Sequence, residues 1–167
     1  MLSDVWINPS LTDGLAAYDP LTKDMYFRSN DYISTLFPEE FIHFFQDNYY
    51  PGGIDQYRKN TMVGFANIEF EAKLIQDLLC VRRDGVCPAL AAGLNKSSEY
   101  SEWIEEIGRE NDHFPNYTEL LQRSPNWGNY NYWDFLEDFK LKYPEYNKPT
   151  EPNLTPKVVN FLNSGGC

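Results

Sequence analysis

The sequence predicts an α+β fold that is mainly helical, in which a compact helical domain carries a small N-terminal β-hairpin element. Three observations lead to this prediction. The 167 residues match the length of one domain, and 42% of them are hydrophobic, which is enough to form a core. Apolar residues recur at helical spacing in several stretches of the chain. Only the stretch 5–27 combines short extended runs with turn residues.

The first predicted elements lie before residue 37. The runs 15–18 and 24–27 flank a segment that begins with Asp19 and Pro20. Asp and Pro both supply turn geometry, so these two runs are predicted to form a β-hairpin. A short helical turn is predicted at 31–36.

Two longer helices are predicted next. The first spans 38–49, because Pro38 suits the first turn of a helix and the Pro-Gly-Gly of 51–53 ends it. The second spans 65–82, where apolar residues fall at steps of three and four. The stretch 62–70 also suits a strand, so the start of this second helix stays open.

The second half of the chain predicts shorter elements. They are a brief helical turn at 88–94 and helices over 98–110, 115–122, 130–141 and 156–162. Residues 148–156 contain three prolines, which is typical of a linker. We therefore expect a single globular domain over 1–147, followed over 148–167 by a Pro-rich linker, a short helix and a flexible C-terminal tail.

Charge and composition narrow the possible functions. The net charge of −11 argues against direct binding to nucleic acid or anionic membrane surfaces, because both are bound through Lys and Arg. It favours a basic protein partner. No apolar run is long enough for a transmembrane helix, so no membrane association is expected. A charge that merely keeps the protein soluble is the alternative interpretation.

The chain is expected in the cytoplasm. Its N-terminus lacks the basic and apolar regions of a secretory signal. The three cysteines, Cys80, Cys87 and Cys167, are too few and odd in number for a disulfide scaffold. Cys80 follows apolar residues of a predicted helix, so we expect it to be a small core residue or an inert thiol.

The first functional hypothesis is a small acidic protein-binding module, such as an inhibitor or an immunity or anti-defence factor that masks a basic site on a partner. The acidic helix 99–112 would steer a basic partner, and 127–133 alternates aromatic residues with Asn and Gly, a mixture typical of binding surfaces. A solvated helix face and an aromatic cap on the core are the alternatives. The predicted partner-binding residues are Glu99, Glu102, Glu105, Glu106, Glu110, Trp127, Tyr130, Tyr132, Trp133 and Asp134.

A second hypothesis is a metal-binding protein of the di-iron carboxylate type. Each of the two histidines follows a glutamate by three residues, a spacing that places metal ligands on one helix face in such bundles. The pairs are Glu40 with His43 and Glu110 with His113. Fe, Mn or Zn would be the cofactor, and Glu69 or Glu71 would add a carboxylate. His43 lies off the apolar stripe, so it is expected at the surface or at an interface.

A third hypothesis is a sugar-binding or small-ligand domain that uses the aromatic segment 127–133. The sequence contains no nucleotide-binding glycine loop, no nucleophile elbow and no zinc-protease motif. It leaves open whether the chain is an enzyme, and it favours a non-catalytic protein without a cofactor.

The sequence Phe-Pro-Glu-Glu-Phe-Ile-His-Phe-Phe of 37–45, with the Pro-Gly-Gly of 51–53, resembles the proline-started helix of SUKH-type immunity proteins. The resemblance covers a small part of the chain. The strand-rich remainder typical of that family is not evident, so membership is not predicted.

Overall fold

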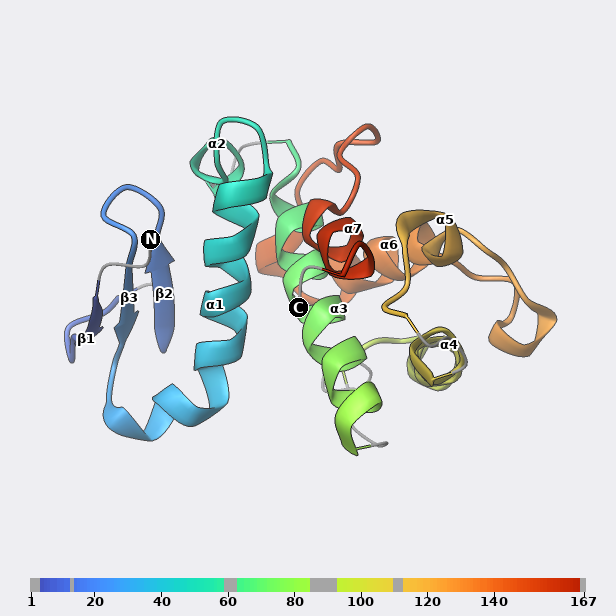
Figure 1. Ribbon diagram of the computed structural model, residues 1–167, viewed down its shortest axis with the longest axis horizontal. Coiled ribbons are helices and arrows are strands. Elements are labelled where there is room, and N and C mark those ends of the chain that lie inside the picture. The colour runs from blue at the N-terminus through green and yellow to red at the C-terminus, as the bar shows by residue number, and fades with distance from the viewer. Residues whose placement is uncertain (1–3, 13, 59–62, 85–92, 110–112, 166–167) are drawn as a thin grey trace.

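The computed structural model describes residues 4–12, 14–58, 63–84, 93–109 and 113–165 (Figure 1). These residues form a three-stranded sheet and seven α-helices, which confirms the predicted mainly helical α+β fold. The sheet lies at one end of the molecule, and α1 lies between the sheet and α3 (Figure 1). No described helix is both long and apolar enough to span a membrane.

The N-terminal sheet contains the predicted hairpin and one further strand. The strands are β1 (Val5–Ile7), β2 (Ala16–Asp19) and β3 (Asp24–Phe27), in the order β1-β3-β2. Strands β2 and β3 are antiparallel, whereas β1 is parallel to β3 and was not predicted. Alternating side chains point toward α1, so Tyr18, Met25 and Phe27 are buried.

Helix α1 (Ile33–Tyr49) begins earlier than predicted. A 3-10 turn, Asn30–Tyr32, continues directly into it, so Pro38 lies inside the helix and not in its first turn. Proline has no N–H to donate to the preceding turn, yet the helix continues. The rings of Phe37 and Phe41 stack at 5.4 Å across this position, and Phe37 also packs on Phe27 of the sheet.

Most of the remaining predicted helices are confirmed. They are α3 (Phe65–Asp84), α4 (Ser97–Arg109), α5 (Tyr117–Leu120), α6 (Tyr132–Lys142) and α7 (Lys157–Asn163). The short α2 (Asp55–Arg58) was not predicted. The sequence left open a strand over 62–70. Residues 65–70 are helical, so this part of the stretch does not form a strand. The turn predicted at 88–94 lies almost entirely outside the described residues.

The main core lies between α3, α4, α6 and α7 and is rich in aromatic rings. Trp103 of α4 packs on Phe135 of α6 at 4.8 Å, and Tyr100 meets the same ring at 5.3 Å. Phe70 of α3 contacts Tyr132 at 5.2 Å. All five of these side chains are fully buried, so part of the aromatic surplus of the sequence serves the core.

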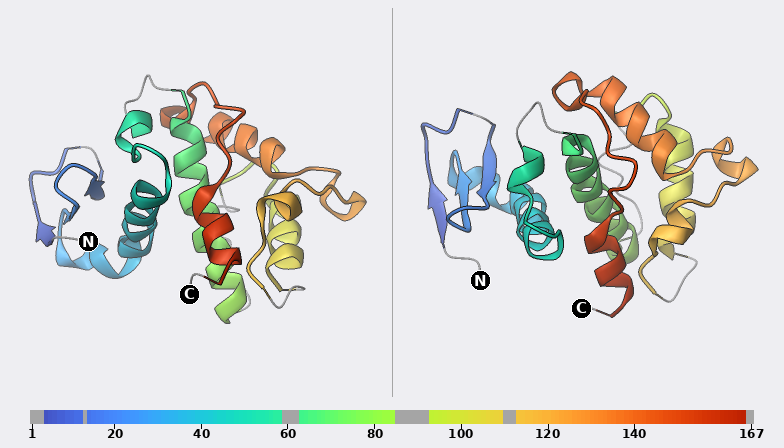
Figure 2. Two further views of the ribbon diagram at one scale, coloured as in Figure 1. Left: turned by 45° about the horizontal axis from the view of Figure 1, so that its top comes forward. Right: turned by 90° about the horizontal axis from the view of Figure 1, so that it is seen from above.

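The chain after residue 147 packs onto the rest of the fold. Leu154, Val158 and Val159 are buried in the two hydrophobic clusters. Helix α7 lies alongside α3 in both views of Figure 2 and also contacts α1. A segment that the sequence places outside the globular domain therefore contributes to its core.

Cys80, near the end of α3, is disulfide-bonded, which corrects the prediction of a core residue or inert thiol. Its side chain is partly exposed, and the neighbouring Leu79 is exposed, so this end of the helix is not enclosed by core. The other two cysteines, Cys87 and Cys167, lie outside the described residues. Disulfides persist mainly in oxidising compartments, so Cys80 does not favour a cytoplasmic location.

The carboxylate of Glu71 on α3 joins three helices. It accepts a hydrogen bond from Gln46 Nε2 of α1 at 2.9 Å. It accepts another at 2.6 Å from the hydroxyl of Tyr50, the residue that directly follows α1. It also accepts from the backbone N–H groups of Val158 (2.9 Å) and Val159 (3.3 Å) in α7. Burial raises the pKa of Glu71, although these four donors oppose that shift. The carboxylate therefore fixes how α1 and α7 pack on α3.

Replacement of this carboxylate should destabilise the protein strongly. We expect Glu71→Leu to lose about 3–5 kcal/mol of unfolding free energy, because four buried donors would lose their acceptor. Urea unfolding followed by circular dichroism measures the loss. Glu102→Leu is the matched control, since Glu102 is exposed on α4 and its replacement should change stability by less than about 0.5 kcal/mol. Equal losses in the two variants would contradict the proposed role of Glu71.

Candidate functional site

Helix α1 buries its polar side, whereas its phenylalanines pack at the margins of the two hydrophobic clusters and stay partly exposed. Four polar residues of the helix are buried, and four of its phenylalanines are only partly buried. The buried polar residues are Glu40, His43, Gln46 and Asp47, and the partly exposed rings are Phe37, Phe41, Phe44 and Phe45. Buried polar groups and exposed apolar patches are the most informative departures from ordinary burial, so both sides of α1 are candidate sites.

The polar side of α1 faces a pocket of about 650 Å³. The pocket lies between α1, the first turns of α3 and strand β2. The charged side chains from the two helices that line it are Glu39, Glu40 and His43 on α1 and Glu69 and Lys73 on α3. It is thus a predominantly acidic pocket that contains a histidine and a lysine.

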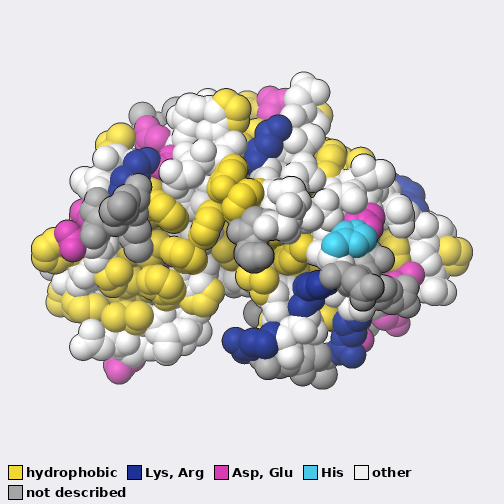
Figure 3. Space-filling view, in the orientation of Figure 1, with side chains coloured by type: hydrophobic (Ala, Val, Ile, Leu, Met, Phe, Trp, Pro, Cys, Tyr) yellow, Lys and Arg dark blue, Asp and Glu magenta, His cyan; other side chains and the backbone are white. Residues whose placement is uncertain are grey.

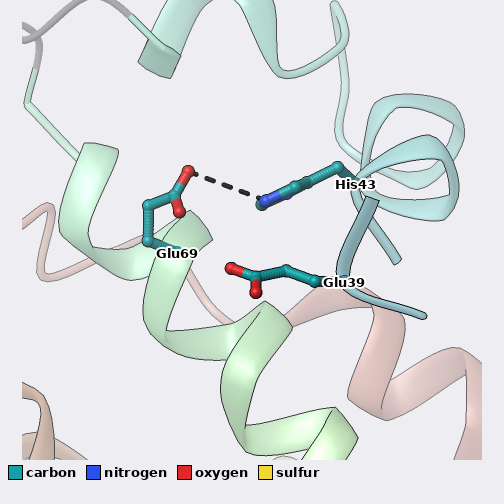
Figure 4. A group of neighbouring side chains, drawn as sticks. All are labelled: Glu39, His43 and Glu69. Carbon is teal, nitrogen blue, oxygen red and sulfur yellow. Dashed lines mark ion pairs between the residues drawn. The ribbon is translucent and has the colours of Figure 1, made fainter. Parts of the chain in front are cut away.

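Three of these side chains converge, as Figure 4 shows. One ligand atom each from Glu39, His43 and Glu69 can be chosen so that all lie within 4.8 Å of one another. His43 Nε2 lies 3.7 Å from Glu69 Oε1. Lys73 Nζ lies 2.6 Å from Glu39 Oε1, so one of the carboxylates already has a cationic partner.

Hydrogen bonds fix the orientation of the His43 ring. Its Nδ1 lies 2.7 Å from Gln46 Oε1. The amide nitrogen of Gln46 donates to the Ile68 carbonyl at 2.8 Å and to Glu71 Oε2 at 2.9 Å, so its Oε1 is the acceptor for His43. Nδ1 must therefore carry the proton, and Nε2 points to Glu69.

The pKa values of Glu40 and His43 in the pocket are both raised above their ordinary values. Burial raises the pKa of Glu40 to about 7; His43 opposes this shift, and the charges of Glu39 and Glu69 add to it. Burial alone would lower the pKa of His43, but the carboxylates of Glu69, Glu40 and Glu39 raise it above its ordinary value. Protons therefore compete with any other cation for this pocket near neutral pH.

The first Glu-x-x-His pair is only part of the site. Glu40 and His43 both line the pocket, but the carboxylate that converges with His43 from the same helix is Glu39. The spacing of four between Glu39 and His43, one helical turn, was the signal that could have found it. His43 was expected at the surface or at an interface; it is buried, so a place at the surface is wrong. Of the two further carboxylates considered, Glu69 joins the site.

The second Glu-x-x-His pair does not join the first. Glu110 lies outside the described residues, and the exposed His113 pairs through Nε2 with Glu119 Oε1 at 3.0 Å. The carbonyl of His113 accepts from Arg82 at 2.8 Å. Arg82 lies roughly 20 Å along α3 from Glu69, the neighbour of His43. The two histidines therefore do not share a metal pair.

Several predicted partner-binding residues have structural roles. Trp127 and Tyr132 are buried in the core. The Trp127 indole donates to Glu106 Oε2 at 2.7 Å, which ties the 3-10 turn Pro125–Trp127 to α4. Asp134 belongs to the capping box at the start of α6 and pairs with Arg123 at 2.8 Å. These contacts account for much of the aromatic and acidic pattern without a partner.

The remaining predicted residues are more accessible. Glu102 is exposed, Glu99, Glu105, Tyr130 and Trp133 are partly exposed, and Glu110 lies outside the described residues. The ammonium group of Lys96 lies 5.1 Å from the centre of the Tyr130 ring.

A shallow hollow on α4 is lined by Glu102, Glu105 and Glu106 together with Arg109 and Asn126. This acidic surface remains a predicted steering surface.

No protein-family profile matches the chain, and neither a curated protein nor a solved structure matches it. The short resemblance of 37–45 to a proline-started helix is therefore not extended to membership in a family. The function has to be inferred from the geometry of α1 and its surroundings.

The buried carboxyl of Glu40 should make stability depend on pH. Its folded pKa of about 7 lies above its ordinary value of 4.5, so the folded state binds the proton more tightly. The contribution of this group is complete below about pH 4.5 and is lost as the pH rises through about 7, by on the order of 3 kcal/mol.

We therefore expect Glu40→Gln to flatten the decline of the unfolding free energy across this pH window. Urea unfolding at several pH values, with a metal chelator present, measures the slope. Glu137→Gln, at an exposed position on α6, is the matched control and should keep the wild-type slope. A Glu40→Gln variant with the slope of the control would refute the assignment.

Proposed function

We propose that the protein is a binding module that contacts a basic partner protein through an aromatic face on α1 and α7. The aromatic face consists of Phe37, Phe41, Phe44, Phe45, Tyr49 and Phe161. The observation that carries the proposal is that these rings touch one another in an unbroken row while none of them is fully buried.

The ring contacts define the extent of this face. Phe41 meets Phe45 edge-on at 5.0 Å, and Phe45 lies 6.2 Å from Phe161 of α7. Tyr49 stacks on Phe161 at 4.1 Å and is still 41% exposed. Figure 3 shows hydrophobic side chains running along α1 and out over the sheet on this side of the molecule. Contiguous apolar surface rich in aromatic rings is typical of protein interfaces.

Strand β1 supports the same interpretation. Val5, Trp6 and Ile7 are 45%, 51% and 43% exposed, although they form a strand. Strand β1 lies at the edge of the sheet, and within the described residues its outer side pairs with no other strand. An unpaired apolar edge is a surface to which another chain can add.

Charge favours a basic partner over a second copy of the chain. Two copies would each bring a net charge of −11 and repel each other, whereas a partner rich in Lys and Arg would be attracted. The accessible carboxylates of α4, such as Glu102 and Glu105, lie away from α1 across the molecule (Figure 1). With the rest of the net charge of −11 they would attract a basic partner, most strongly at low ionic strength, while the aromatic face makes the contact.

In this role the protein would cover a functional surface of its basic partner, as an inhibitor or an immunity factor does. A sugar site on 127–133 has less support, because Trp127 and Tyr132 are buried and hold the core together. A cytoplasmic location remains a prediction, and the contact through α1 does not depend on it.

A charge placed on the aromatic face should abolish binding. Proteins captured with the wild-type chain and lost with Tyr49→Lys are purified, and each is titrated alone by calorimetry. We expect a Lys/Arg-rich partner whose affinity falls at least roughly 30-fold with Tyr49→Lys, because an aromatic hot spot contributes about 2 kcal/mol or more.

Leu141→Lys is the matched control, since Leu141 is 70% exposed on α6 and away from the aromatic face. It should leave the affinity unchanged. A variant with Glu102 and Glu105 changed to Lys should mainly slow association and reduce its salt dependence. If Tyr49→Lys binds like the wild type, or if sedimentation equilibrium shows that the occupant is a second copy, the proposal fails.

A further inference from the structure

The geometry points to a divalent transition-metal site formed by Glu39, His43 and Glu69, with a ligand preference that fits Zn²⁺. This site lies on the polar side of α1, whereas the aromatic face lies on the other side of the same helix. The inference does not depend on the proposed partner.

The three side chains are almost at the spacing that an ion requires. Zinc binds nitrogen and carboxylate oxygen at about 2.0–2.2 Å, so its tetrahedral ligands lie roughly 3.4 Å apart. His43 Nε2 and Glu69 Oε1 are 3.7 Å apart, and the third ligand atom, from Glu39, lies within 4.8 Å of both. Small rotations of the two glutamate side chains would bring all three ligand atoms within coordination distance of one ion.

The surroundings of His43 are those of a metal ligand. Nδ1 is held by Gln46, which is itself held by Glu71, so Nε2 is the ring nitrogen that faces Glu69. Ligand histidines usually donate their second nitrogen to a fixed acceptor, which sets the tautomer and the ring orientation. The chain from Glu71 through Gln46 to His43 supplies that acceptor from buried groups.

The ligand types select the kind of ion. One imidazole and two carboxylates suit Zn²⁺ or a similar first-row ion, whereas Ca²⁺ and Mg²⁺ prefer oxygen ligands alone. Three protein ligands would leave a coordination position open to water or a small anion, as in zinc sites that are not purely structural. That position would face the pocket of about 650 Å³.

The positive charge of Lys73 should weaken the binding of a metal ion, so its removal provides a sharp test. Its ammonium group lies 2.6 Å from Glu39 Oε1, so an incoming ion must displace it or share that carboxylate. Removal of this positive charge should strengthen metal binding, because Glu39 becomes available and the pocket becomes more negative. A misfolded protein would not show such a gain.

The full chain is stripped with a chelator and titrated with Zn²⁺ by calorimetry. We expect one ion per chain at this site, an affinity at least tenfold lower in Glu69→Gln and in His43→Gln, and an affinity about tenfold higher in Lys73→Met. Thermal unfolding gives a second readout, since Zn²⁺ should raise the Tm of the wild type but not that of Glu69→Gln.

Two control variants exclude other sites. Glu102→Gln removes an exposed carboxylate of α4, and His113→Gln removes the other histidine with its Glu119 contact. Both should bind Zn²⁺ like the wild type. The inference is overturned if the wild type binds no Zn²⁺, if His113→Gln abolishes binding, or if Glu69→Gln and Lys73→Met both leave the affinity unchanged. Should Glu69→Gln fail to fold, as judged by circular dichroism, the affinity of Lys73→Met decides.

Discussion

The buried carboxylate of Glu71 is the constraint on which the arrangement of α1 depends. It binds Gln46 and Tyr50 on one side and the first N–H groups of α7 on the other, so α1 must present Gln46 and, with it, His43 to α3. Gln46 then has its carbonyl oxygen left for His43, which fixes the imidazole in the pocket. The same orientation turns the phenylalanines of α1 away from α3. One interaction thus produces both the acidic pocket and the aromatic face.

This orientation runs against the usual distribution of side chains. Buried polar groups are tolerated only when they are hydrogen-bonded, and those of α1 are. Asp47, for example, accepts from Tyr18 Oη and from the backbone N–H of Ile54, both at 3.0 Å. The rings of α1, in contrast, forgo part of the roughly 25 cal/mol per Å² that full burial would contribute. Natural proteins depart from the usual rule of apolar residues inside and polar residues outside mainly at functional sites.

The predictable part of the fold is the part in which apolar spacing and burial coincide. In α4 the stripe that includes Trp103 and Ile107 is also the buried side, so sequence periodicity was sufficient. Strand β1 has only three residues and pairs with a strand that is distant in sequence, which leaves no local signal. In α1 polar residues are buried beside apolar ones, so the apolar spacing did not show that His43 is buried. Pro38 was misplaced because a 3-10 turn leads into the helix five residues earlier. Trp127 was predicted to bind a partner because its segment mixes aromatic residues with Asn and Gly, with an aromatic cap on the core as the alternative. Its burial and its hydrogen bond to a distant glutamate on α4 favour that alternative.

The pocket could be predicted only in part, because its ligands come from two helices. The sequence shows that Glu39, Glu40 and His43 share one region of α1, but it does not show which carboxylate of α3 faces them. That choice follows from the packing of α1 on α3, in which Glu71 takes the structural role and Glu69, about half a turn earlier on α3, faces the pocket. Since Glu39 and His43 move with α1 while Glu69 moves with α3, the distance between them depends on the contact that Glu71 maintains. The geometry of the pocket is therefore a consequence of helix packing, and any change that shifts α1 along α3 must alter it.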